Sequence, residues 1–116
     1  MGISTHILDT ATGRPAAAVP VTLARFDDGA WLPLATSQTD PDGRCKSLFP
    51  STQPLTPGIY RIHFATNVYY QQQQLHGLYP FIEITFTVPP HPHPSEQHFH
   101  IPLLLTANGY TTYRGS

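Results

Sequence analysis

Residues 97–105 read Gln-His-Phe-His-Ile-Pro-Leu-Leu-Leu, and this stretch decides the fold class. Large apolar residues recur at every second position, which is the side-chain period of a β-strand and not of a helix. The apolar face carries Phe99, Ile101, Leu103 and Leu105, and the opposite face carries His98, His100, Pro102 and Leu104. We therefore predict a strand that buries one face in a core and shows two histidines on the other.

The same alternation appears at the beginning of the chain. Residues 3–9 place Ile3, Thr5 and Ile7 on one face, and Ser4, His6 and Leu8 on the other. His6 is thus predicted on an outward sheet face, like the histidines of residues 97–105. Further strands are predicted at residues 19–26, 31–39, 60–65 and 82–88, because each is rich in β-forming residues or alternates.

Turn residues separate these runs. Residues 12–15, 27–29 and 40–43 contain the Gly, Asp and Pro residues typical of turns, and Arg44 follows the last of them. Thirteen prolines disfavour helices, and residues 67–75 are the one helix we predict, with Asn67 as its cap and Gly77 as its stop. Short strands at regular spacing predict an all-β sandwich of seven or eight strands.

Length and charge narrow the class of protein. The 116 residues predict a single domain over residues 1–116. Six Lys and Arg residues and a net charge of −1 argue against a nucleic-acid partner. No run approaches the roughly 18 apolar residues of a membrane span, so no membrane partner is expected. Cys45 is the single cysteine and excludes an internal disulfide.

Four histidines, at positions 91, 93, 98 and 100, raise the question of a metal site. The first two lie in a proline-rich loop, there is no cysteine pair, and no helix places histidines one turn apart. We therefore predict no metal. A Gly-x-Ser-x-Gly elbow for nucleophilic catalysis is also absent from the sequence.

Blocks of sequence along the whole chain resemble the 5-hydroxyisourate hydrolases, which are transthyretin-like enzymes of urate breakdown. The blocks are residues 4–9 with 13–16, residues 39–44, residues 79–83, residues 98–105 and the closing Tyr113-Arg114-Gly115-Ser116. The Asp-Gly-Arg turn alone is a weak signal. The order of the blocks and the Tyr-Arg-Gly-Ser ending are together specific.

The resemblance implies an all-β, transthyretin-like sandwich of two antiparallel four-stranded sheets with one short helix. It also implies a homotetramer with active sites in a central channel, no cofactor, and hydrolysis of 5-hydroxyisourate to 2-oxo-4-hydroxy-4-carboxy-5-ureidoimidazoline (OHCU). The family's catalytic set falls on His6, Arg44 and His98. Its substrate-binding set falls on His6, Arg44, Tyr113, Arg114, Gly115 and Ser116.

These residue types suit the implied chemistry. Hydrolysis of an amide needs a base for water, a charge for the developing oxyanion and an acid for the leaving nitrogen. Two histidines and an arginine cover those roles, but the sequence leaves open which histidine is the base. His63 and His100 come next as candidates and are left out of the predicted site.

Two other classes of protein are alternatives to an enzyme. A hormone carrier such as transthyretin proper shares the implied fold, but it lacks this His, Arg, His set and the Tyr-Arg-Gly-Ser ending. A structural interaction module would not explain polar catalytic types on outward sheet positions. The lone cysteine and the absence of a leader favour the cytoplasm, and the peroxisome is the alternative, although Arg-Gly-Ser does not match the Ser-Lys-Leu address.

Overall fold

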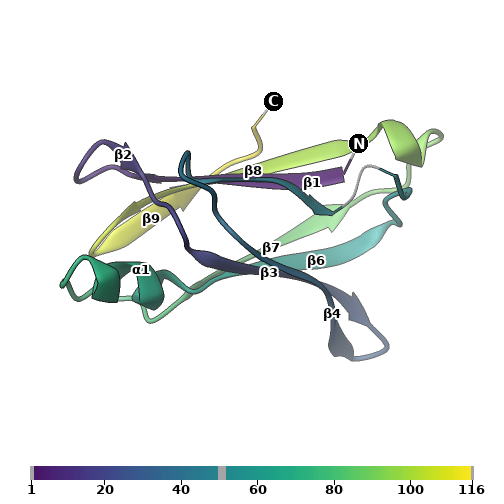
Figure 1. Ribbon diagram of the computed structural model, residues 1–116. Coiled ribbons are helices and arrows are strands. Elements are labelled where there is room, and N and C mark those ends of the chain that lie inside the picture. The colour runs from purple at the N-terminus through teal and green to yellow at the C-terminus, as the bar shows by residue number, and fades with distance from the viewer. Residues whose placement is uncertain (1, 50–51, 116) are drawn as a thin grey trace.

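The computed structural model describes residues 2–49 and 52–115. Two sheets pack face to face, with a short helix beside one end of the sandwich (Figure 1). The first sheet holds β1 (Gly2–Asp9), β2 (Arg14–Pro15), β5 (Arg44–Phe49), β8 (His98–Thr106) and β9 (Gly109–Thr112). The second holds β3 (Pro20–Asp27), β4 (Ala30–Gln38), β6 (Gly58–Phe64) and β7 (Ile82–Val88). The all-β, two-sheet prediction is confirmed.

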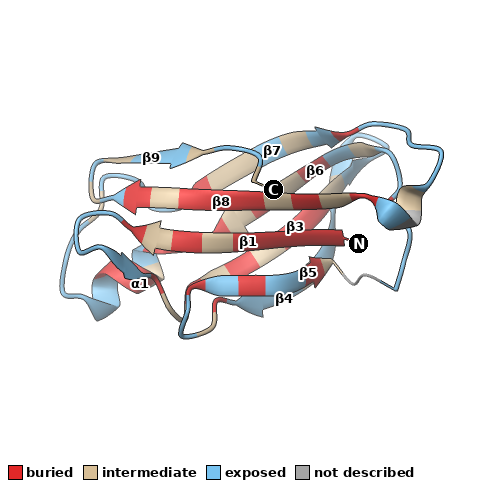
Figure 2. Cartoon of the chain, turned by 90° about the horizontal axis from the view of Figure 1, so that it is seen from above, coloured by how far each residue is buried: buried red, intermediate tan, exposed pale blue. Residues whose placement is uncertain are grey.

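The predicted alternation of core-facing and outward-facing side chains is confirmed in β1 and β8. Ile3, Ile7 and Leu103 are fully buried between the sheets, whereas His6, His98 and His100 are only half-buried on the opposite face of the same strands. Figure 2 shows this banding along β1 and β8. The first sheet thus has one face in the core and one face turned outward.

The expected pairing of strands needs correction. Sheet one was expected to be four-stranded and antiparallel, but it has five strands, and β1 runs parallel to β8. Side chains alternate with a period of two residues in parallel and in antiparallel sheets, so alternation does not show in which direction neighbouring strands run. The edge of β1 away from β8 pairs with β5 along one part and with the two-residue β2 at its end, which adds the fifth strand.

The helix prediction was correct in kind and wrong at both ends. The helix α1 spans Thr66–Gln72, and the residue before it, Ala65, makes no side-chain cap. It ends because Gln74 adopts a φ of 58°, which lets the Leu75 N–H donate to the Tyr70 carbonyl at 2.8 Å. Gly77 has another role, because a Cβ there would lie 2.6 Å from the Tyr70 ring. A 3₁₀ turn at Pro94–Glu96 precedes β8.

Two tyrosines of α1 fasten the helix to the first sheet. The Tyr69 hydroxyl donates to Asp9 Oδ2 at 2.7 Å, and the Tyr70 hydroxyl donates to the Thr106 carbonyl at 2.7 Å. Burial raises the pKa of Tyr70 to about 12, and burial and then the Asp9 hydrogen bond raise that of Tyr69. Both hydroxyls therefore stay protonated donors that hold the ends of β1 and β8 against the helix.

The turn before β5 depends on one glycine. The Gly43 N–H donates to the Asp40 carbonyl, and the Gly43 carbonyl accepts the Ile7 N–H, both at 2.8 Å. Gly43 has a φ of 76°, and a Cβ built on it would lie 2.5 Å from the Ile7 oxygen. The close approach of this turn to β1 sets Arg44 opposite His6 in the sheet register. Only glycine satisfies both the backbone angle and the contact.

Replacing Gly43 with Ala should therefore destabilise the fold more than the same change at Gly29. Gly29 has a similar φ of 80° but open space around its Cβ position, so Gly29→Ala measures the backbone strain alone. We expect Gly43→Ala to cost about 1–3 kcal/mol beyond Gly29→Ala, as overpacking does. Urea unfolding of both variants provides the measurement. Equal losses would show that the contact with β1 is unimportant.

Candidate functional site

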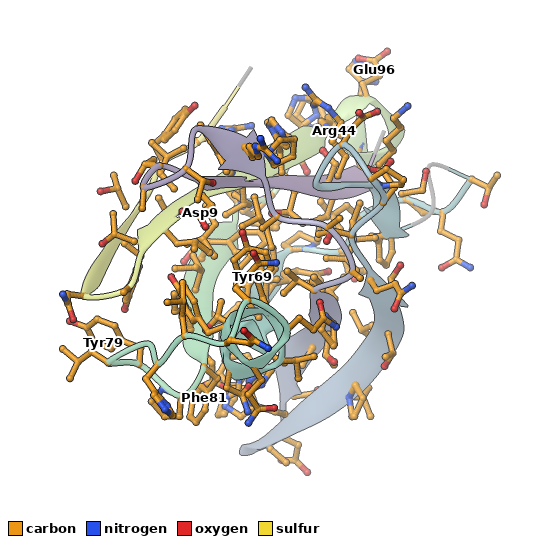
Figure 3. All side chains as sticks on the ribbon, turned by 60° about the vertical axis from the view of Figure 1, so that its left-hand side comes forward. Asp9, Arg44, Tyr69, Tyr79, Phe81 and Glu96 are labelled. Carbon is orange, nitrogen blue, oxygen red and sulfur yellow. The ribbon has the colours of Figure 1, made fainter. Side chains whose placement is uncertain are left out.

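A polar hollow lies on the outward face of the first sheet. It has a volume of about 230 Å³ and is lined by Ser4, Thr5, Arg44, Lys46, His98 and His100. Figure 3 shows Arg44 on one side of this sheet, and Tyr69 and Phe81 on the other. The hollow thus lies away from the core and the helix.

Three strands supply the lining through their register. In the parallel pair, Ser4 stands beside His100, and His98 stands beside Gly2. On the other edge of β1, His6 is the partner of Arg44. Among the predicted catalytic residues, Arg44 and His98 line the hollow directly, whereas His6 lies next to it, two residues beyond Ser4.

Ser4 connects the two histidines of β8. Its Oγ lies 2.9 Å from Nε2 of His98 and 2.8 Å from Nδ1 of His100. Ser4 itself is only 7% exposed. A serine hydroxyl has one hydrogen to donate and lone pairs to accept, so it is able to serve both rings at once. The rings are therefore held in fixed orientations.

The electrostatic surroundings favour neutral imidazoles. Burial lowers the pKa of His98 below its ordinary value. Burial also lowers the pKa of His100, with further contributions from the charges of Arg44, His6 and His98. Since the ordinary value is already below neutral pH, both rings are predominantly neutral there, and each has a nitrogen able to accept a proton.

The C-terminal residues return across β8 (Figure 2). The Gly115 N–H donates to the His100 carbonyl at 2.8 Å, and Nη2 of Arg114 donates to the His98 carbonyl at 3.3 Å. A Cβ on Gly115 would lie 2.6 Å from Cδ2 of His100, so only glycine allows this approach. The tail is thus held against β8 as far as Gly115, and the predicted site residue Ser116 lies outside the described residues.

Tyr113 and Arg114 do not line the polar hollow of this chain. They border a second, more apolar cavity of about 400 Å³ together with residues of β7 and β8. Tyr113 is 54% exposed, and the Arg114 guanidinium stacks 4.1 Å from the Phe99 ring centroid. Within one chain, these two predicted substrate-binding residues are therefore separate from the cavity that holds Arg44 and His98.

The sequence prediction left out four residues that line the hollow, namely Ser4, Thr5, Lys46 and His100. The signal for three of them was the two-residue period, since Ser4 precedes His6, Lys46 follows Arg44 and His100 follows His98 by two positions. His63, the other near candidate, lies on the second sheet.

His63 has a different environment. Its Nδ1 lies 2.9 Å from Oε2 of Glu83, and its ring stacks on Phe81. Within residues 2–49 and 52–115, no group of three or more His, Cys, Asp or Glu side chains gathers as metal ligands would. In the same part of the chain, no helix has the length and apolar character needed to cross a membrane.

Solved structures place this architecture in the transthyretin class. Sea bream transthyretin in complex with thyroxine superposes with a TM-score of 0.88 at 30% identity, over 99% of this chain and 95% of the other. The 5-hydroxyisourate hydrolase of Klebsiella pneumoniae has a TM-score of 0.82 at 34% identity, over 100% of both chains.

Sequence comparison narrows the class to a family. The model of the HIUase/Transthyretin family matches residues 3–115, and the chain belongs to that family. The 5-hydroxyisourate hydrolase of Salmonella dublin is 43% identical over 98% of this chain and 80% of its own length. The mouse (Mus musculus) 5-hydroxyisourate hydrolase is 40% identical over 98% of this chain and 94% of its own.

The lowered histidine pKa values predict a pH dependence of stability. A histidine whose folded pKa lies below its unfolded value binds fewer protons when folded, so stability is complete above about pH 6.5 and falls as pH drops through the folded pKa. NMR titration should give midpoints below about 6.5 for His98 and His100. Midpoints above that value would contradict the predicted desolvation.

Proposed function

We propose that this protein hydrolyses 5-hydroxyisourate, opening the six-membered ring with water at the N1–C6 amide bond to give OHCU. The observation that carries the proposal is the gathering of Arg44 and two neutral histidines around one polar hollow on the outer face of the first sheet. Relatives with the name 5-hydroxyisourate hydrolase align over nearly the whole chain and support it. The proposed reaction needs no cofactor and no metal.

The side chains divide the chemistry between them. A neutral imidazole, from His98 or His6, takes a proton from the attacking water. The Arg44 guanidinium remains charged at all relevant pH values and polarises the C6 carbonyl, then stabilises the oxyanion that forms there. A protonated imidazole returns a proton to N1 as the ring opens. The proposed role of Tyr113, Arg114, Gly115 and Ser116 is to close the pocket and orient the ring.

The polar lining favours an enzyme over a carrier. The thyroxine complex of sea bream transthyretin shares the fold, so the fold alone does not decide between the two functions. The hollow of this chain is lined by two imidazoles, a guanidinium, an ammonium and two hydroxyls. Such a lining costs desolvation energy when a mainly apolar ligand covers it, whereas it suits a polar, planar purine derivative.

We propose a homotetramer as the active form. The outward face of the first sheet carries Leu8 and Leu104 beside the polar residues, and both are half-buried already. Tyr113, by contrast, faces a separate cavity in a single chain. Assembly through this face would cover the leucines and allow one subunit to contribute to the pocket of another.

A cytoplasmic location completes the proposal, with the peroxisome as the alternative. Cys45 is a free, buried cysteine, which fits a reducing compartment.

Alanine variants of the proposed catalytic residues should lose most of the activity. 5-Hydroxyisourate is generated from urate with urate oxidase, and its ultraviolet decay is followed with EDTA-treated protein. We expect acceleration by the wild type, and losses of roughly 10²-fold or more in kcat for His6→Ala, Arg44→Ala and His98→Ala. His63→Ala, on the other sheet, serves as the control and should retain full rate. No acceleration by the intact protein would refute the function.

Removing residues 113–116 should separate folding from activity. The strand β9 ends at Thr112, so we expect the truncated chain to keep its sandwich. Loss of the closing residues should abolish most activity, because about 1 Å of substrate misplacement can cost about 10²-fold. Sedimentation should give the intact protein a mass of about four times 12.9 kDa. A fully active truncation, or a fully active monomer, would contradict the proposed tetrameric site.

A further inference from the structure

We propose that Ser4 joins His98 and His100 into a proton relay, in which His98 takes the proton from water and His100 delivers one to the leaving nitrogen. The inference rests on the hydrolysis proposed above and assigns the acid and base roles that the sequence leaves open, with His6 beside Arg44 kept as a residue that binds the substrate. Ser4 acts here through the two rings and is a positioning residue, and His100 becomes a catalytic residue outside the predicted set.

The geometry couples the protonation of the two rings. The Ser4 hydroxyl lies within hydrogen-bond distance of Nε2 of His98, at 2.9 Å, and of Nδ1 of His100, at 2.8 Å. Because it has one hydrogen, it donates to one ring nitrogen and accepts an N–H from the other. When both rings are neutral, they are therefore both protonated on Nε2 or both protonated on Nδ1. Of the two mixed pairs, one directs both N–H groups at Oγ and leaves the Ser4 hydrogen without a ring nitrogen to receive it, and the other leaves one of the two nitrogens without a hydrogen.

The outer nitrogens of the relay, Nδ1 of His98 and Nε2 of His100, have no hydrogen-bond partner among the residues that the structure describes. Both side chains line the same hollow as Arg44. Gly115 packs against the His100 ring and so limits the ways in which that ring can turn.

The proton balance of the step follows from the Nε2-protonated state. As water attacks C6, Nδ1 of His98 takes one of its protons, and the Nε2 proton of His98 moves to the Ser4 oxygen. The Ser4 proton passes to Nδ1 of His100, and the Nε2 proton of His100 goes to N1 as the N1–C6 bond breaks. The water oxygen is then bonded to C6, N1 has gained one hydrogen, and both rings are neutral in the Nδ1-protonated state. Exchange with solvent restores the starting tautomers.

The surrounding charges favour passage of the proton over its retention. Among the described residues, the titratable and charged groups around the pair are Arg44 and Lys46 of β5, His6 of β1 and Arg114 of the tail, and the positive N-terminus also acts on His98. Because the two arginines and the lysine are positive, an additional positive charge on either histidine ring is disfavoured. Burial, and then the charges of Arg44, His6 and His98, lower the pKa of His100, which makes its protonated form a stronger acid than an ordinary histidine and suits it to proton delivery.

The first test measures tautomers in the resting protein and needs no substrate. Long-range ¹H–¹⁵N NMR distinguishes Nδ1–H from Nε2–H imidazoles. At a pH where both rings are neutral, we expect His98 and His100 to show the same tautomer or the same mixture. In Ser4→Ala the two rings should become independent. Opposite tautomers in the wild type would overturn the relay.

The second test uses kinetics with matched variants. Ser4→Ala should lower kcat by about 10²-fold with little change in KM, since proton transfer acts only in the transition state. Ser4→Thr keeps the hydroxyl and should recover most of the rate. Tyr70→Phe removes a hydroxyl hydrogen bond that lies remote from the hollow, and it should keep the wild-type rate. It serves as the control for the loss of a hydrogen bond elsewhere in the fold.

His100→Asn separates the relay from simple support of the ring. Asparagine is able to keep a hydrogen bond at the Nδ1 position but has no Nε2 proton to deliver. We expect His100→Asn to lower kcat by the same factor as Ser4→Ala does. The double variant should lose no more of kcat than either single variant, because the two residues act as a unit. If the wild type is active and either Ser4→Ala or His100→Asn keeps the full wild-type activity, the relay is overturned but the function is not. An inactive wild type with matched tautomers would overturn the function, and with it the proton path, but not the Ser4 bridge.

Discussion

The in-register parallel pairing of β1 with β8 is the constraint on which the rest of the structure depends. It brings Ile3 beside Phe99 and Ile7 beside Leu103 on the core side, and Ser4 beside His100 on the outward side. Because side chains alternate with a period of two, a shift of either strand by one residue would exchange its core and outward faces. The hydrophobic core therefore fixes the register, and the register fixes the geometry of the polar hollow.

The other parts of the site build on that pair. The strand β5 adds to the free edge of β1, where the close turn at Gly43 places Arg44 opposite His6. The tail adds to the other side through the Gly115 hydrogen bond to the His100 carbonyl. At both positions a glycine allows a backbone approach that a Cβ would block. The site is thus assembled by backbone contacts of separate segments on one sheet face.

Sequence alone predicted the faces of the strands well, because burial imposes its period directly on residues such as Phe99 and Ile101. It did not predict which strands are neighbours or in which direction they run, since alternation is the same in parallel and antiparallel sheets. The parallel β1–β8 pair and the fifth strand were therefore missed. Asn67 was assigned as a helix cap on propensity alone, but the helix is held instead by buried contacts of Tyr69 and Tyr70.

The candidate site, like the fold, was predicted in part from the sequence and in part missed. The resemblance to 5-hydroxyisourate hydrolases supplied His6, Arg44 and His98, and the structure brings Arg44 and His98 to one hollow with His6 beside it. Ser4 was missed because the two-residue period places it on the outward face with His6 but does not show which side chains it contacts. Its importance depends on distances to two rings more than 90 residues away in the chain.

The most direct test of the account is to locate where a planar purine binds. Urate, the precursor of the proposed substrate, is added to the ¹⁵N-labelled protein, and amide and imidazole NMR shifts are mapped. We expect the perturbed residues to cluster around Ser4, Arg44 and His98, while the fluorescence of Trp31 on the second sheet stays unchanged. Shifts that cluster instead around Trp31 and His63 would contradict the placement of the site.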